Sequence, residues 1–194
     1  MSETLSRRLN ALGLLAVSAV LLVAFLEQFV FNELPCPLCI LQRAGFAIAG
    51  TGLALNVAVA IRPAHYGIMI LGAVAGGIVS LRQIALHVVP GTGAYGSAIL
   101  GLHLYTWAFV AAGAIVVGAA LMLLSSRQFT PDLPVDGGLP RGRTLGRIAL
   151  LLFGFLVLGN ALSTLAECGV GLCPDNPESY EAFDALRDLL SGAR

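Results

Sequence analysis

Long apolar runs separated by short polar connections dominate the chain. Five of these runs are about 20 residues long, which is the length an α-helix needs to cross the hydrocarbon core of a bilayer. They occupy residues 9–31, 40–61, 66–86, 103–124 and 147–166. Five such helices use about half of the chain. The pattern therefore predicts an all-α integral membrane protein in which residues 1–194 form a single membrane domain.

The composition agrees with this prediction. Hydrophobic residues make up 57% and charged residues 11% of the 194 residues, whereas a soluble domain carries about 25% charged residues. Eleven arginines balance eleven acidic residues, so there is no bulk field to attract nucleic acid. The expected surroundings are a lipid bilayer, and no nucleic-acid partner is expected.

The first apolar run follows Arg7 and Arg8, as the apolar region of a signal peptide would. It exceeds the roughly 7–15 residues of such a region, and no clear cleavage site follows it. We expect a retained first helix.

The distribution of charge predicts the orientation of the spans. With a cytoplasmic N-terminus, seven arginines lie at the cytoplasmic ends of spans: Arg7, Arg8, Arg62, Arg127, Arg141, Arg143 and Arg147. Eight acidic residues lie on the other side: Glu27, Glu33, Glu167, Asp175, Glu178, Glu181, Asp184 and Asp188. This is a positive-inside pattern, and five spans then place the C-terminus outside.

Two connections have distinct expected roles. Residues 125–146, rich in Pro, Gly and Asp, predict an irregular cytoplasmic loop. Residues 90–102 are expected to lie on the membrane surface and to cover whatever is bound there. Tyr105 and Trp107 follow, and they fit an interfacial aromatic belt. The spans also hold small-residue patches such as residues 72–76, which favour close approach of helices in lipid.

Both cysteine pairs fall on the predicted outer side, where disulfides are permitted. The first pair, Cys36 and Cys39, stands directly before an apolar helix. A Cys-x-x-Cys at a helix start favours the thiolate, because the helix dipole and free backbone N–H groups stabilise it. The thiolate is the species that attacks disulfides. Arg43 lies four residues after Cys39 on the same helix face, where it can stabilise a thiolate or developing charge on an acceptor.

The second pair, Cys168 and Cys173, encloses four residues of which two are glycine, so a tight closed loop is possible. Four cysteines allow three connectivities, and the sequence leaves the choice open. A structural clamp is one alternative. Tetrahedral zinc held by four thiolates is another, although Pro37 and the oxidising compartment argue against it.

Further ionisable residues break the charge pattern on the outer side. Arg82 lies in the last turn of the third run, where it either contributes to a site or extends to the headgroups. An arginine inside a span costs about 2.5–3.5 kcal/mol at mid-membrane. His87, where this run emerges, is at about the depth of Cys39, and His103 could face the same region.

The segment from residue 167 to 194 is predicted to be periplasmic and to end in a short amphipathic helix. Asn176, Pro177 and Glu178 have the character of an N-cap, a first-position proline and an acidic first turn. Apolar residues then recur at helical spacing: Tyr180, Phe183, Leu186 and Leu190. We expect this helix to rest on the outer surface or on the protein, with docking of a soluble partner as the alternative.

Residues 34–46, with their Cys-x-x-Cys-x3-Arg core, resemble the signature of the DsbB family. Members are bacterial inner-membrane enzymes that reoxidise a periplasmic thioredoxin-fold thiol oxidase (DsbA-like) and pass electrons to a membrane quinone, ubiquinone or menaquinone. The resemblance covers residues 9–124 and implies a four-helix bundle for the first four spans. It also implies that Cys39 is the quinone-proximal sulfur and that Cys36 exchanges with the second pair. Arg43 and His87 are the implied quinone contacts, and we add Arg82 to this candidate set.

The chain departs from the family in the position of its second pair. The family usually carries that pair between spans three and four, where residues 88–102 here contain no cysteine. The pair instead follows a fifth span, and the predicted topology returns it to the periplasmic side.

The resulting hypothesis is a five-span membrane thiol-disulfide oxidoreductase. It would reoxidise a periplasmic dithiol partner through Cys168 and Cys173, then through Cys36 and Cys39, to a quinone. The alternative from another class is a non-catalytic membrane protein with structural disulfides or a four-cysteine metal site. A third possibility is electron flow outward for disulfide reduction.

Overall fold

The computed structural model describes residues 1–94, 96, 98–130, 143–169 and 171–192. Its long helices are α1 (Glu3–Val30), α2 (Pro37–Ala58), α3 (Pro63–His87), α4 (Leu104–Leu123) and α5 (Arg143–Cys168). Smaller elements are the antiparallel strands β1 (Ala98–Ile99) and β2 (Leu102–His103), the 3₁₀-helix η1 (Ser126–Phe129) and α6 (Glu181–Gly192). All five long helices are apolar and long enough to cross a membrane, which confirms the five predicted spans and the all-α class.

The connections differ in part from expectation. The strand pairing of β1 with β2 was not predicted. The predicted irregular loop over residues 125–146 has helical ends, because η1 begins at Ser126 and α5 at Arg143, while residues 131–142 lie outside the described residues. Backbone N–H groups left free at helix ends favour such short helical turns.

The start of α6 was predicted too early. The helix begins at Glu181 rather than near Pro177. The Tyr180 carbonyl accepts the backbone N–H groups of Phe183 and Asp184, and the Ser179 hydroxyl bonds to the Asp184 carboxylate. These local bonds define a start four residues after Pro177. Apolar side chains of α6 such as Phe183 and Leu190 are exposed.

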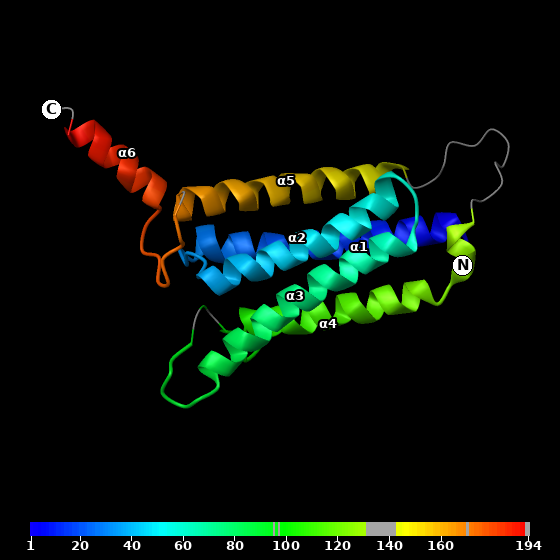
Figure 1. Cartoon of the computed structure of the whole chain (residues 1–194), viewed down its shortest axis with the longest axis horizontal. Helices are drawn as coiled ribbons and strands as arrows, with labels where there is room; N and C mark the ends of the chain where they lie inside the picture. Colours follow the sequence, from blue (N-terminus) through cyan, green and yellow to red (C-terminus); the bar gives the residue numbers. More distant parts are fainter. Residues whose placement is uncertain (95, 97, 131–142, 170, 193–194) are drawn as a thin grey trace.

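The long helices lie side by side in the order α5, α1 with α2, α3, α4 (Figure 1). Helix α2 packs against α1 and α3, α5 covers α1 and α2 on one side, and α4 covers α3 on the other. The α1–α2 connection, the β1–β2 hairpin and the end of α5 lie at one end of the bundle, and α6 projects from that end (Figure 1). The N-terminus lies at the opposite end.

Buried polar side chains fasten the opposite end of the bundle. Asn10 of α1 donates its amide to the Tyr66 hydroxyl of α3 at 2.8 Å and accepts from the Asn56 amide of α2 at 2.9 Å. The Tyr66 hydroxyl donates to Gln128 of η1 at 3.0 Å. Buried polar groups need such partners, so this cluster fixes the register of three helices and η1.

Glycines bring α2 and α3 into backbone contact, as the small-residue pattern predicted. A methyl group added at Gly72 would lie 2.5 Å from the Ala49 nitrogen and 2.9 Å from the Gly45 oxygen. One added at Gly45 would lie 2.6 Å from the Gly76 Cα. Helix association in lipid depends on this close packing. It sets the spacing of the two helices that carry most of the candidate site.

We expect Gly72→Ala to destabilise the protein by about 1–3 kcal/mol, because the methyl group meets backbone that cannot move aside. The measurement is reversible unfolding in mixed micelles. Gly113→Ala on α4 is the matched control, since nothing lies within 4 Å of the added methyl group. It should be neutral, or stabilise by up to about 1 kcal/mol through helix propensity. Equal stability of the two variants would contradict the packing described here.

Candidate redox site

Cys36 is the N-cap of α2. Its backbone is extended (φ −65°, ψ 162°), Pro37 occupies the first turn, and its sulfur accepts the Cys39 backbone N–H at 3.3 Å. The two sulfurs of the first pair are 2.7 Å apart, and both residues are free thiols. The Cys-x-x-Cys segment is therefore folded over the helix start, where unpaired N–H groups and the helix dipole favour negative charge.

This geometry makes the Cys36 thiol acidic. The hydrogen bond from the Cys39 thiol lowers its pKa most strongly, burial opposes this, and the backbone N–H groups of Cys39 and Leu38 lower it further, to about 7. The sequence predicted a lowered thiol pKa at this helix start from the helix dipole and free N–H groups. The pKa of Cys36 is lowered, but the Cys39 thiol, which that prediction did not consider, is the largest cause.

Alkylation of the reduced first pair is expected to reveal this pKa. The rate at Cys36 should rise with pH through a midpoint near pH 7, because only the thiolate reacts. In Cys39→Ala the main stabilising hydrogen bond is lost, so the midpoint should move up toward the roughly 8.5 of an ordinary thiol. Iodoacetamide labelling followed by peptide mass spectrometry measures both. An unchanged midpoint in the variant would show that the Cys39 thiol does not lower the pKa.

Two buried glutamine side chains surround the first pair, and the sequence analysis missed both. The Gln83 amide of α3 lies 3.5 Å from the Cys36 sulfur and 3.7 Å from the Cys39 sulfur. Its oxygen accepts the Gln42 amide of α2 at 2.6 Å. Gln83 is 1% exposed. It places a neutral amide donor against both sulfurs.

Arg43 is the seventh residue of α2 and reaches across to α1. Its guanidinium donates to Gln28 Oε1 and to the Ala24 carbonyl, each at 2.8 Å. It also lies over the Phe25 ring, 5.8 Å from the ring centre. An arginine inside a span is costly unless it is paired, and these contacts satisfy part of its donor capacity.

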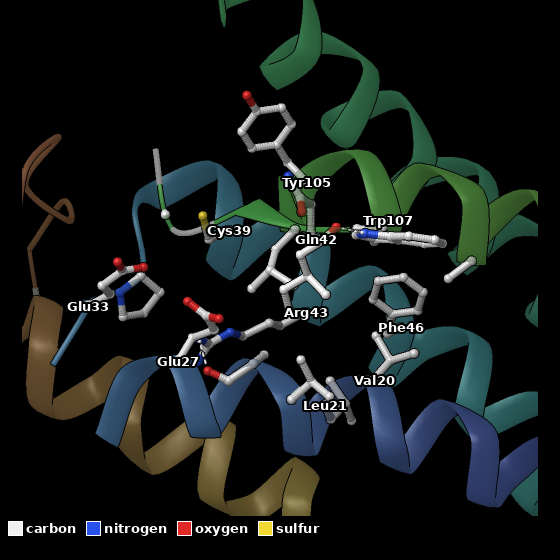
Figure 2. Close-up of a pocket in the computed structure, with 18 of the residues that line it drawn as sticks. Val20, Leu21, Glu27, Glu33, Cys39, Gln42, Arg43, Phe46, Tyr105 and Trp107 are labelled. Carbon is white, nitrogen blue, oxygen red and sulfur yellow. Dashed lines mark hydrogen bonds between the residues drawn. The ribbon is translucent and has the colours of Figure 1, made fainter. Parts of the chain in front are cut away.

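A cavity of about 460 Å³ lies between α1, α2, α4 and the β1–β2 hairpin. Its lining is largely apolar, and Cys39, Gln42 and Arg43 supply polar groups from α2. Figure 2 shows Arg43 extending from α2 toward α1, where Glu27 lies, with Phe46 and Trp107 farther along the cavity.

The hairpin after α3 forms part of the cavity wall. Ile99 and Leu100 line the cavity, and the Trp107 indole N–H donates to the Ile99 carbonyl at 2.9 Å. The expectation that this connection covers a bound molecule fits that placement. Tyr105 and Trp107, interpreted from sequence as an interfacial belt, both line the cavity, and Tyr105 is buried.

The other two predicted site residues on α3 do not line the cavity. Arg82 is exposed. His87 stacks its ring on Tyr105, 5.6 Å between ring centres, so it lies behind a cavity residue. His103 stacks on the same tyrosine at 5.3 Å. Helical spacing could have found Gln83, because it is four residues before His87 and shares its face, whereas Arg82 does not.

The second pair forms a disulfide between Cys168 and Cys173 at the end of α5. Of the three connectivities the sequence allowed, the structure has this one. Cys168 is buried and Leu172 next to Cys173 is 96% exposed. The bond leaves no thiolates there for a four-cysteine metal site. Among the residues the structure describes, no group of three or more His, Cys, Asp or Glu side chains is placed to hold a metal.

The Gln28 side-chain amide links Arg43, beside the first cysteine pair, to the segments on either side of the second pair. Gln28 of α1 accepts from Arg43 through its oxygen, and its nitrogen donates to Ser163 of α5 at 2.7 Å and to the Tyr180 hydroxyl at 2.8 Å. The segment around the second pair is thereby tied to the residue beside the first. Both pairs lie at the same end of the bundle (Figure 1).

The fold and site define a multi-span helical membrane protein with a free Cys-x-x-Cys at a helix start beside an apolar cavity. The family model "Disulfide bond formation protein DsbB" matches residues 6–97. Disulfide bond formation protein B of Burkholderia pseudomallei strain 1106a is 40% identical over 91 residues, 44% of this chain and 52% of the relative. The protein of the same name from Chromobacterium violaceum is 42% identical over 73 residues, 34% of this chain and 43% of the relative.

Over residues 6–97 the chain is therefore similar to the DsbB family of disulfide bond formation proteins. The five apolar helices are those of a multi-pass membrane protein. The chain spans about half the length of the curated relatives it matches. The family match ends before α4, so α5 and the second pair lie outside it. No solved structure matches.

Proposed function

We propose that the protein is a quinone-dependent thiol-disulfide oxidoreductase that reoxidises a periplasmic thioredoxin-fold dithiol protein. The observation that carries the proposal is the lining of one apolar cavity by Cys39 and Arg43, at the end of the bundle where the second pair also lies. The first pair would thus connect a soluble disulfide relay to a membrane-embedded acceptor.

The cavity residues fit a quinone. The volume of about 460 Å³ falls within the range of small-molecule sites, and the lining is mostly apolar with a few polar groups. Arg43 would donate to a carbonyl oxygen, and the rings of Phe46, Tyr105 and Trp107 offer flat apolar surfaces. His87 would position Tyr105 from behind, and exposed Arg82 is left out of the proposed site. A bound quinone supplies the oxidising power of the system, since it takes up two electrons and two protons.

The cysteines divide the work between two exchanges. The partner's dithiol attacks the Cys168–Cys173 disulfide, so that the partner gains a disulfide and the second pair gains two thiols. The second pair then exchanges with a Cys36–Cys39 disulfide and leaves two thiols in the first pair. Thiols in the first pair and a disulfide in the second correspond to the state after this exchange. The reduction potentials of the two pairs set the direction of electron flow. In a two-electron couple, a difference of about 30 mV corresponds to ~1.4 kcal/mol.

The test is turnover by the purified full chain in detergent. We expect soluble quinone analogues to be reduced in step with loss of thiols from a reduced thioredoxin-fold protein, two thiols for each quinone, the stoichiometry of a two-electron couple. Quinone absorbance and thiol titration follow the two sides of the reaction. Tightly bound zinc with no quinone-dependent thiol loss would instead favour the non-catalytic alternative. Net reduction of the partner by quinol would reverse the proposed direction.

A further inference from the structure

Glu167 is a buried acidic side chain to which the proposed function gives no role. It lies in the last turn of α5, directly before Cys168 of the second pair, and is 0% exposed. Within the part of the chain that the structure describes, neither carboxylate oxygen has a hydrogen-bond partner. Buried polar groups almost always have one, and an orphaned carboxylate is expensive to keep.

The surroundings of Glu167 connect it to both cysteine pairs. Arg43 and Cys36 of α2 interact with it electrostatically. Other titratable groups at this end of the bundle are Cys39 on α2, Glu27 on α1, Asp175, Glu178 and Tyr180 in the connection that follows the disulfide, and Glu181 and Asp184 at the start of α6. Arg43 directs donors to Gln28 and Ala24, which leaves Glu167 beside a positive charge with no hydrogen bond from it.

A carboxyl group in this position is suited to hold a proton. Within the described residues neither of its oxygens is engaged by a hydrogen bond, so either can accept a proton from a neighbouring thiol. If this position had only a structural role, an apolar or amide side chain would stabilise the fold more than a carboxylate, because neither has the desolvation cost of a carboxylate. Buried acidic groups beside reactive side chains are characteristic of functional sites.

We propose that Glu167 holds a proton during the exchange between the second and first cysteine pairs. This inference rests on the proposed function, because it requires that the two pairs exchange. A thiol of the second pair gives its proton to Glu167, and its sulfur attacks Cys36. A sulfur–sulfur bond forms between the pairs, the Cys36–Cys39 bond breaks, and Cys39 leaves as a thiolate.

The remaining thiol of the second pair completes the exchange. Its sulfur attacks its neighbour in the pair, the Cys168–Cys173 bond forms, and the mixed disulfide breaks to release Cys36. Glu167 returns its proton to Cys36, and the proton of the second attacking thiol goes to Cys39. The exchange starts with one dithiol and one disulfide and ends with one of each, so it needs no other oxidant or reductant. The group thereby keeps the attacking sulfur nucleophilic where little water reaches.

The test is a single exchange in the full chain without quinone. Fully oxidised protein is mixed with a reduced thioredoxin-fold protein and quenched with acid, and mass spectrometry quantifies thiols at each cysteine over time and pH. In Glu167→Gln we expect the soluble partner to reduce the Cys168–Cys173 disulfide at the wild-type rate. The exchange that passes the thiols on to Cys36 and Cys39 should be at least about tenfold slower in this variant. Its rate should also lose the part of its pH dependence that comes from the carboxyl group. Glu167→Asp should restore that pH dependence.

Glu178→Gln is the matched control, because that carboxylate is exposed in the same segment and its loss should change neither step. Glu167→Gln should keep or raise the unfolding temperature, which separates a proton-holding role from a structural one. Time-resolved infrared spectra recorded during the exchange in the wild-type protein provide a measurement without substitution and should contain a transient carboxylic acid band. The inference is overturned if the wild type carries out the transfer and Glu167→Gln does so with the same rate and pH profile. It is also overturned if no such band is found. Absence of transfer in the wild type overturns the proposed function itself.

Discussion

Cys39→Ala is expected to abolish steady-state, quinone-dependent thiol oxidation, with a loss of at least about a hundredfold. The first pair can pass on two electrons only by forming its disulfide, and Cys39 is the member that lines the cavity. Alanine at this position leaves Cys36 with no sulfur to bond to. Because the second pair is untouched, a single burst should persist in which the partner loses two thiols to the Cys168–Cys173 disulfide. Rapid-quench thiol counting measures the burst, and quinone absorbance measures turnover.

Cys39→Ser separates the redox role of this residue from its effect on Cys36. The serine hydroxyl can still donate to the Cys36 sulfur, so the acidity of Cys36 should stay closer to that of the wild type than in Cys39→Ala. Turnover should nevertheless be lost in both variants, because neither can form a disulfide. Substantial turnover in Cys39→Ser would contradict the assignment of Cys39 as the residue that hands over electrons.

Arg43→Ala is expected to raise the quinone KM by about ten- to a hundredfold. A charged hydrogen bond to an acceptor contributes about 1.5–3 kcal/mol, and each ~1.4 kcal/mol is a factor of ten. The rate at which the partner reduces the second pair should change much less, since Arg43 is directed to α1 and the cavity and not to the disulfide. Arg43→Lys keeps the charge and should recover part of the affinity. It loses the forked geometry that reaches Gln28 and Ala24 together.

Two arginines serve as controls for this prediction. Arg62→Ala removes an exposed charge at the opposite end of the bundle, and Arg82→Ala removes an exposed charge near the same end as the cavity. Neither should change the quinone KM. A loss in Arg82→Ala equal to that in Arg43→Ala would return Arg82 to the quinone site. Loss of folding in Arg43→Ala is monitored by unfolding temperature, because Arg43 also joins α1 to α2.

The comparison of Arg82 with Gln83 shows how far sequence reasoning reached on α3. Arg82 was predicted as a site residue because charged residues are rare in a span, but the structure places it in an exposed position. Gln83, one residue along, faces the sulfurs and is buried. Neutral amides give no signal in a charge count. Only the 3.6-residue period, applied from Gly72 and Gly76 through Gln83 to His87, would have placed it on the inner face.

Gln28 and Glu167 were hidden for a different reason. Gln28 was a polar residue near the end of an apolar run, and Glu167 counted only toward topology. Their significance comes from α5 packing against α1 and α2, which brings Ser163 and Tyr180 to Gln28 and brings Arg43 near Glu167. No local pattern specifies which helices of a bundle become neighbours.

The sequence by itself determined the class of the protein and its five spans, and it predicted a lowered thiol pKa at the start of α2 and the grouping of both pairs on one side. Each depends on local physics: hydropathy over about 20 residues, the helix start with its neighbouring Cys39 thiol, and the alternation of spans across a bilayer. Only the tertiary structure decided that Cys168 bonds to Cys173, that Arg43 is anchored by Gln28, and that Glu167 is enclosed without a partner. These features depend on contacts between residues far apart in the chain, and helix packing alone sets those contacts.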